Sequence, residues 1–315
     1  MEPRKSLTAV IVTLNGERLF DRCLDSLSFC DRILVVDSFS SDRTEAIARA
    51  HGALFIQNPW PGNARQIRFG LDWLEANAPT DWVLILDCDE ICTPRLAASI
   101  QAAIASPGQA KAFSMPRRTW YFDRFLRHGG SYPDRLFRLF RPEAIRIENS
   151  GAHQRLVPNT SSGYLVGHLD GDLLHYTYAS FRNQLDKLND YAERGARDME
   201  SRGRRGGVAR GLAHGLWRFA AMYVMRLGFL DGRAGFLMAA HTAFYSFLKY
   251  VRIKEGSWGA PFDAADAAPN ATPNATKVTQ RPPRRPSARG TARHPSAGAA
   301  AAQDMEPTQG TEEDA

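Results

Sequence analysis

Two aspartates separated by one residue, Asp87 and Asp89, are the strongest candidates for a chemical role in this 315-residue chain. They directly follow the apolar run WVLIL (82–86), which predicts a strand buried on both faces. Because alternate residues of an extended backbone point the same way, both carboxylates are expected to face one cation. Carboxylate oxygens suit Mg²⁺ or Mn²⁺, which commonly complete their shell with water and substrate phosphate. The pattern therefore predicts a divalent-cation site. The alternative is a helix cap before Pro94.

Two further predicted strands end in polar residues. Leu7–Leu14 and Arg32–Asp37 are continuous apolar runs rich in β-branched residues, and polar side chains follow at Asn15 and Ser38. A short strand is expected at 53–57, and helices are expected at 17–27, 40–49 and 62–76. This alternation predicts an α/β fold with an open, mainly parallel sheet. Ligands bind such sheets at the carboxyl ends of their strands, so we expect these polar ends to converge on one site with Asp87.

The composition changes along the chain and predicts four regions. Residues 1–193 are expected to form the catalytic α/β domain, with additional strands at 113–117 and 136–140. Residues 194–211 are rich in Arg and Gly and predict a basic linker. Residues 212–255 contain two apolar helical stretches, which are shorter than the ~20 residues that span a bilayer. Residues 256–315, rich in Ala, Pro, Thr and Arg, predict a disordered tail.

The two apolar stretches and the basic segment before them together suggest a membrane surface. Amphipathic helices with aromatic residues lie in the lipid interface, and arginines are attracted to anionic lipid. We therefore expect 212–255 to be a C-terminal amphipathic extension in peripheral contact with a membrane. The alternative is a pair of core helices that pack on the α/β domain.

Charge and cysteine content restrict the remaining possibilities. The formal net charge of +6 favours partners that carry phosphate, whether nucleic acid, anionic lipid or nucleotide-sugar. No nucleic-acid-binding motif accompanies it, so no nucleic-acid partner is expected. The four cysteines form no C-x-x-C pair, and the N-terminal residues before the first strand lack the apolar region of a signal peptide. These features predict reduced thiols and a cytoplasmic location.

Three motifs at the predicted strand ends resemble the inverting glycosyltransferase family 2. They are VIVTLNGE (10–17), VVDSFSSDRT (35–44) and DWVLILDCDE (81–90). Later segments are similar to the lipopolysaccharide core β-glucosyltransferase subgroup: WPGNARQ (60–66), YPDRLFRLF (132–140), GAHQRL (151–156), LLHYTY (173–178) and LGFLDGRAGF (227–236). The resemblance covers about residues 7–255 and implies the Rossmann-like GT-A fold, an open and mainly parallel sheet flanked by helices.

The resemblance also implies a reaction and its participants. A sugar, such as glucose, would move from a nucleotide-sugar, such as a UDP-sugar, with inversion at C1 and with Mg²⁺ or Mn²⁺ as cofactor. The acceptor would be the lipopolysaccharide core or a similar glycolipid, reached at the inner face of the cytoplasmic membrane.

Individual residues take roles from the same resemblance. Four of them would line the nucleotide pocket: Thr13, Leu14, Asn15 and Glu17. Asp37 would contact the base and Arg65 the donor. Asp87 would face the ribose or the metal, and Asp89 would bind the metal.

The general base is the least determined role. Relatives usually carry His-Glu where this chain has His153-Gln154, and an amide cannot take up a proton at neutral pH. Asp134 is the preferred candidate and Glu90 the second. His175 is expected either to touch the metal or the diphosphate, or to be a structural histidine. Three arginines are candidates for neutralising phosphate: Arg135, Arg138 and Arg141.

Three other functions compete with this hypothesis. A polyprenyl-phosphate glycosyltransferase would differ only in its acceptor. A non-catalytic nucleotide-binding scaffold at the membrane is compatible with Gln154. A nicotinamide-dependent oxidoreductase is disfavoured because no G-x-G-x-x-G follows the first strand.

Overall fold

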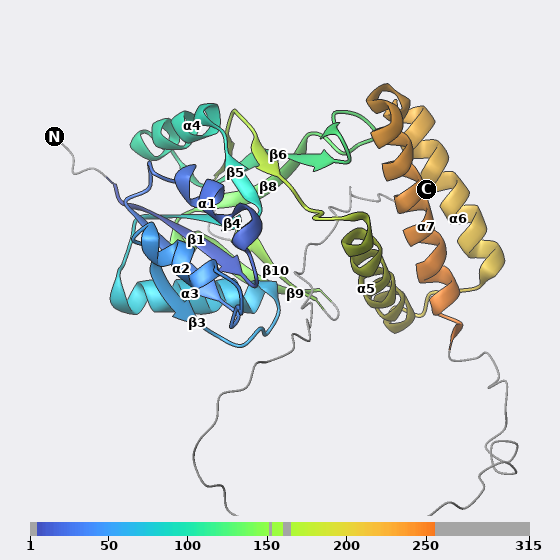
Figure 1. The fold of residues 1–315 in the computed structure, drawn as a ribbon, viewed down its shortest axis with the longest axis horizontal. Helices are drawn as coiled ribbons and strands as arrows, with labels where there is room; N and C mark the ends of the chain where they lie inside the picture. The colour runs from blue at the N-terminus through green and yellow to red at the C-terminus, as the bar shows by residue number, and fades with distance from the viewer. Residues whose placement is uncertain (1–4, 151–152, 160–164, 256–315) are drawn as a thin grey trace, which may run out of the picture.

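A mixed sheet flanked by helices forms the N-terminal part of the protein (Figure 1). The computed structural model describes residues 5–150, 153–159 and 165–255. The first half of the domain consists of β1 (Leu7–Thr13), α1 (Glu17–Asp25), β2 (Arg32–Asp37), α2 (Thr44–Ala50), β3 (Leu54–Gln57), α3 (Asn63–Asn77) and β4 (Trp82–Asp87). The second half adds β5 (Glu90–Cys92), α4 (Pro94–Ala105), β6 (Ala110–Tyr121), β7 (Arg124–Phe125), β8 (Asp134–Phe140), η1 (Pro142–Ala144), β9 (Ile145–Ser150), β10 (His153–Pro158), β11 (Leu165–His168) and β12 (Leu173–His175).

The order of the strands brings the predicted polar ends together. Within the described residues the main path of the sheet runs β3-β2-β1-β4-β8-β6-β12-β5. Its first four strands are parallel, whereas β8 runs antiparallel to both β4 and β6. In the register Thr13 pairs with Asp37, and Val12 pairs with Asp87. The carboxyl ends of β1, β2 and β4 therefore lie side by side, which confirms the predicted α/β fold with its open parallel sheet.

Apolar clusters cover both faces of this sheet, which explains why its strands are continuously hydrophobic. On one face Ile11, Leu84 and Leu86 pack with residues of α1 and α4. On the other face Val10 and Val36 pack with residues of α3. Gly70 allows α3 to approach closely, because a Cβ at this position would lie 2.8 Å from the Val36 side chain. The two clusters fix the strand ends that carry the candidate site.

Helices make up the C-terminal part, in the order α5 (Phe181–Ser201), α6 (Val208–Ala220), η3 (Ala221–Met225), η4 (Gly228–Asp231) and α7 (Gly232–Arg252). Figure 1 shows α6 and α7 as a pair beside the α/β domain, with α5 between them and the sheet. Two glycines of α6 let the pair pack closely, since a Cβ at Gly211 would lie 2.9 Å from the Phe247 carbonyl oxygen and one at Gly215 would lie 3.0 Å from that of Ala243. We call α6, η3, η4 and α7 the helical extension.

The predicted linker 194–211 is mostly helical. Helix α5 continues to Ser201 and α6 begins at Val208. Ion pairs at the i,i+4 spacing join Arg197 to Glu193 and Arg202 to Asp198, and such pairs favour a helix despite the high arginine content. Only 202–207 separates the two helices.

No helix in the described ranges combines the length and the apolar character needed to span a bilayer. The predicted tail, 256–315, lies outside the described residues.

Candidate active site

Asp87 and Asp89 lie at the carboxyl end of β4, and both are buried. Asp89 occupies a two-residue turn between β4 and β5, so the expectation that both aspartates lie on one extended strand is wrong. The chain turns there because β5 leaves β4 and pairs with β12. The turn still keeps the two carboxylates close. Burial, and then the charge of Asp87, raise the pKa of Asp89 to about 6.

The loop after β1 packs directly against this turn. A Cβ at Gly16 would lie 2.6 Å from Thr13 Oγ1 and 2.9 Å from the sulfur of Cys88, the residue between the two aspartates. The Ser38 amide donates to the Thr13 carbonyl oxygen at 2.9 Å, which joins the end of β2 to the same edge. The structure therefore brings Thr13, Asp37 and the aspartate turn together.

One carboxylate oxygen at this edge has an unusual environment. Asp89 Oδ1 is buried and accepts no hydrogen bond from any described residue. Its ion-pair neighbour is His175 Nε2, at 3.6 Å. Burial lowers the pKa of His175 well below its ordinary value, so this ring is neutral at physiological pH and supplies no countercharge. A buried, ionisable oxygen without a hydrogen bond fits a cation ligand.

Two carboxylates can hold a cation only if other groups complete its shell. No cluster of three or more His, Cys, Asp or Glu in the described residues is arranged to hold a metal ion. Mg²⁺ is often bound by one or two carboxylates with substrate phosphate and water. Asp87 and Asp89 match that smaller donor set.

Glu90 lies behind the aspartates. Its side chain is fully buried, its Oε2 accepts from the Asp87 amide at 3.0 Å, and its Oε1 lies 3.3 Å from Arg138. Burial raises its pKa to about 7, although the Arg138 charge opposes this effect. Arg138 also donates to Asp87 Oδ2 at 2.8 Å. Glu90 therefore holds the turn and Arg138 in place. It does not line the cavity described in the next paragraph.

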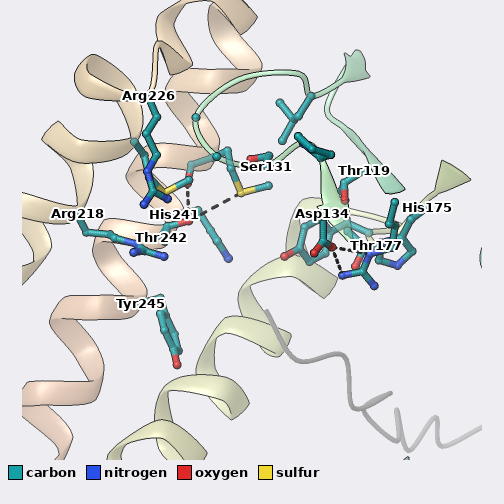
Figure 2. A pocket seen from close by; sticks show the side chains of 18 of the residues that line it. Thr119, Ser131, Asp134, His175, Thr177, Arg218, Arg226, His241, Thr242 and Tyr245 are labelled. Atoms are coloured by element: carbon teal, nitrogen blue, oxygen red, sulfur yellow. Dashed lines mark hydrogen bonds and ion pairs between the residues drawn. The ribbon is translucent and has the colours of Figure 1, made fainter. Parts of the chain in front are cut away.

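A cavity of about 410 Å³ lies between the ends of β6, β8 and β12 and the helical extension (Figure 2). On the sheet side Figure 2 shows Asp134, His175, Thr119 and Thr177, whose polar groups come from neighbouring strand ends. His175 belongs to this lining and also lies beside Asp89, so the cavity adjoins the aspartate turn.

Asp134, the first residue of β8, lines this cavity, and one of its carboxylate oxygens is held by an arginine. Arg117 donates to Asp134 Oδ2 from Nε at 2.9 Å and approaches it with Nη2 at 2.7 Å. The other oxygen, Oδ1, has no hydrogen-bond or ion-pair partner among the described residues. Arg117 also lies 3.6 Å from Glu90, and it thereby links the cavity to the buried carboxylates.

Two residues predicted to contact the nucleotide, Asn15 and Glu17, connect the loop after β1 to the loop after β2, and a third, Asp37, holds the second loop and the end of β3. Asn15 Oδ1 accepts from the Ser41 amide at 2.9 Å, and Glu17 Oε2 accepts from the Arg43 amide at 3.0 Å. Asp37 accepts from the Ser40 amide at 2.9 Å and from Gln57 at 3.0 Å. These contacts shape the rim of the site, and nucleotide contact by the three side chains stays a prediction.

The remaining predicted residues differ in their positions. Leu14 is half-buried beside Asn15, and Arg65 is exposed in the first turn of α3. Gln154 belongs to β10, and the side chains of 151–156 lie outside the described residues. Arg141 lies over the Trp82 ring, away from the aspartates in the sheet register.

Sequence reasoning missed two cations near Asp89. Lys187 of α5 is buried and donates to the Thr177 carbonyl oxygen at 3.0 Å. Its charge and that of Arg18 of α1 oppose the rise in the Asp89 pKa, so both lie close to this carboxylate. A signal was present for Lys187, because it follows Gln184 on the buried face of an amphipathic helix.

Comparisons with known proteins bear on the family of this chain. Residues 8–157 match the model of a family described as Glycosyl transferase family 2. The lipopolysaccharide core biosynthesis glycosyltransferase LpsC of Rhizobium meliloti is 27% identical over 264 residues, which cover 80% of this chain and 93% of that protein. The uncharacterized glycosyltransferase RT0209 of Rickettsia typhi is also 27% identical over 264 residues, covering 80% of this chain and 87% of that protein.

Among solved structures, the chain is similar to glucosyl-3-phosphoglycerate synthase from Mycobacterium tuberculosis in complex with Mn²⁺, uridine diphosphate and glucosyl-3-phosphoglycerate. The identity is 24%, the coverage is 36% of this chain and 44% of that chain, and the TM-score is 0.31. The family match and the two relatives confirm the family predicted from the sequence motifs: residues 8–157 form a glycosyltransferase family 2 domain, and the chain is a glycosyltransferase.

Proposed function

We propose that this glycosyltransferase moves a hexose from a UDP-sugar to a lipopolysaccharide-core or similar glycolipid, with inversion at C1. The observation that carries the proposal is the buried Asp89 carboxylate, whose Oδ1 lacks a hydrogen bond beside Asp87 and at the carboxyl edge of the parallel strands. The likeness to a lipopolysaccharide core glycosyltransferase along most of both chains supports the choice of acceptor.

Asp87 and Asp89 would hold the divalent cation, Mg²⁺ or Mn²⁺. A bound cation neutralises the donor diphosphate and stabilises the charge on the departing nucleoside diphosphate. Arg138 keeps one oxygen of Asp87 in a fixed position, while Glu90 holds the Asp87 amide. Asp89 thus supplies the oxygen that most needs a positive partner, and loss of its charge is expected to weaken cation binding most.

Asp134 would act as the general base. A base must reach the proton of the acceptor hydroxyl; Asp134 lines the cavity, and its Oδ1 has no partner among the described residues. Arg117 fixes the carboxylate through Oδ2 and leaves Oδ1 available. The second candidate, Glu90, is fully buried and uses both oxygens within the protein, so we assign it a positioning role.

The helical extension would rest on the inner face of the cytoplasmic membrane. Seven large apolar side chains of α6, η3 and η4 are 46–70% exposed, and we call them the apolar patch: Leu212, Leu216, Trp217, Val224, Met225, Phe229 and Leu230. Helix α6 carries no acidic residue, so anionic lipid meets no like charge along it. Exposed apolar area of this kind marks interaction surfaces, and its mixture of aromatic and aliphatic groups suits a lipid interface.

The direct test is turnover of a panel of nucleotide-sugars with and without Mn²⁺. We expect cleavage of one UDP-hexose that depends on the added cation and is lost in Asp89→Asn. Asp72→Asn, an exposed aspartate of α3, is the matched control and should keep full turnover. Cleavage of no donor by the wild-type protein, or full cleavage by Asp89→Asn, contradicts the proposal. Chromatography of the labelled product separates transfer to a lipopolysaccharide core from transfer to a polyprenyl phosphate.

A further inference from the structure

The wall of the cavity opposite Asp134 has no role in the chemistry described above. This wall belongs to the helical extension and contributes Arg218, Arg226, His241, Thr242 and Tyr245. Figure 2 shows these side chains across the cavity from Asp134 and His175. A molecule that fills this cavity and presents a hydroxyl to Asp134 would therefore contact them.

The cavity lining carries an excess of positive charge. Four arginines line it, Arg117, Arg135, Arg218 and Arg226, against one carboxylate, Asp134. His241 adds no charge to this wall, because burial lowers its pKa to about 4. The excess at neutral pH is therefore three positive charges, which favours an anionic occupant.

Three of these arginines are not neutralised in the part of the chain that the structure describes. Arg117 is paired with Asp134, whereas Arg135, Arg218 and Arg226 form no ion pair with any residue that the structure describes. Guanidinium groups bind phosphate and carboxylate with two parallel hydrogen bonds, and unpaired ones beside a cavity are available for such contacts.

The loop that leads to Asp134 holds Arg226 in place. The Gly129 amide donates to the Arg226 carbonyl oxygen at 2.8 Å. The Arg226 side chain lies over Gly130, where a Cβ would come within 2.8 Å of Nη1. Gly130 also has a φ of +78°, which favours glycine. The position of the guanidinium thus depends on a glycine four residues before Asp134.

Asp231 fixes the start of the same loop, next to Gly129. Its Oδ2 accepts from the amides of Arg127 and His128 at 2.9 and 2.7 Å, and its Oδ1 lies 3.0 Å from His128 Nδ1. The loop that carries Asp134 is therefore anchored to the helical extension at both Arg226 and Asp231. The two walls of the cavity keep a defined spacing, as recognition of one ligand across them requires.

We propose that Arg218 and Arg226 bind an anionic group, a phosphate or a carboxylate, on the acceptor saccharide and so place its hydroxyl at Asp134. This inference rests on the proposed function and specifies the chemistry of the acceptor. The hydroxyls of Thr242 and Tyr245 lie on the same wall and can donate to the sugar. A neutral acceptor of the same shape would leave the two arginines unpaired and bind more weakly.

The test compares Arg218→Gln and Arg226→Gln with Arg210→Gln, an exposed position two turns before Arg218 on the same helix and outside the cavity lining. The acceptor is the water-soluble core oligosaccharide released from lipopolysaccharide by deacylation. A second sample has its phosphates removed with hydrofluoric acid but keeps its carboxylates. Thermal melts check that each variant is folded.

We expect the acceptor KM to rise about tenfold in Arg218→Gln and in Arg226→Gln and to stay unchanged in Arg210→Gln, since a hydrogen bond to a charged group has about this worth. If phosphate is the anchor, the acceptor KM of the wild-type protein is also about tenfold higher with the dephosphorylated oligosaccharide. Removing the phosphates then raises the acceptor KM of the two variants no further. If carboxylate is the anchor, the variants are impaired with both samples. An unchanged acceptor KM in both variants overturns the inference.

Two further measurements separate this inference from its alternatives. If the arginines bind a lipid headgroup instead, the variants lose binding to phosphatidylglycerol vesicles while their KM for the soluble acceptor is unchanged, and the inference is overturned. If the wild-type protein cleaves no donor, the proposed function fails. Calorimetric binding of the oligosaccharide then still tests the inference, which requires weaker binding in both variants.

Discussion

Replacing Asp89 by Asn is expected to stabilise the metal-free protein while removing its activity. The native carboxylate is buried with one oxygen that accepts no hydrogen bond, and the neighbouring charge of Asp87 repels it. The fold therefore favours the protonated form, which raises the pKa of Asp89 from 3.8 to about 6. An amide has nearly the same shape and carries no charge to bury, so Asp89→Asn removes this cost.

The size and the pH dependence of the effect follow from that pKa. Each pKa unit is worth about 1.4 kcal/mol, so the difference between 3.8 and about 6 corresponds to roughly 3 kcal/mol. Well below pH 3.8 the carboxyl is protonated in both the folded and the unfolded state, and the penalty vanishes. Between pH 4 and 6 the folded state binds more protons than the unfolded state, so the stability of the wild-type protein falls as pH rises. Above pH 6 the full penalty is present.

Urea denaturation of both proteins in EDTA, at pH 4 and at pH 8, measures this difference. We expect Asp89→Asn to have a free energy of unfolding higher than wild type by about 2–3 kcal/mol at pH 8, with little difference at pH 4. A variant that is less stable than wild type at pH 8 would refute the reasoning, because the carboxylate would then be stabilised by the protein.

Asp37→Asn is the matched control. Asp37 is as buried as Asp89, but its carboxylate accepts hydrogen bonds from Ser40 and Gln57. An amide at this position replaces the charged acceptor of Ser40 and Gln57 and leaves these donors poorly satisfied. This variant should therefore be less stable than wild type by about 1–3 kcal/mol. Opposite signs at two buried aspartates would distinguish a carboxylate that lacks a partner for its charge from one that the protein satisfies with hydrogen bonds.

Three other expectations follow from the site and the helical extension. Asp134→Asn should lower kcat for transfer by about 100-fold or more with little change in the donor KM, because the base is lost and the cation site is kept. Stopped assays with labelled donor measure both constants, and an unchanged kcat would exclude the base role. Leu216→Asp together with Trp217→Ser should reduce co-sedimentation with phosphatidylglycerol vesicles, since both side chains are more than 60% exposed in the apolar patch. Equal binding by wild type and variant would argue against membrane contact through this patch. Gly235→Ala should destabilise the helical extension by about 1–3 kcal/mol in thermal or urea unfolding, because the new methyl group would lie 1.9 Å from the Gly228 carbonyl oxygen; wild-type stability would show that the close packing is absent.

Strand patterns allowed the parallel half of the fold to be predicted. Runs such as 7–14 and 82–86 are apolar on both faces because helices cover both sides of the sheet, and this signal is local in sequence. The polar residues that follow them had to converge once the strands were parallel, so the grouping of Thr13, Asp37 and Asp87 was also predictable.

Contacts between distant segments could not be predicted in the same way. The helix expected at 40–49 begins only at Thr44, because the Ser41 amide bonds to Asn15 in the loop after β1 and the Ser40 amide bonds back to Asp37. The partners of Asp134 and of Glu90 depend on how β6 and β8 pair, a long-range register that composition does not encode. The basic lining of the cavity needs Arg218 and Arg226, about 80 or more residues beyond Asp134, to pack against the sheet.

The most direct test of the account is the anomalous scattering of Mn²⁺ in crystals grown with Mn²⁺ and uridine diphosphate. We expect one strong peak within coordination distance, about 2–2.5 Å, of Asp89 and beside Asp87, with diphosphate oxygens on its open side. Crystals of Asp89→Asn under the same conditions should lack this peak. A nucleotide that binds with no cation at the aspartate turn, or a cation elsewhere in the protein, would contradict the central claim.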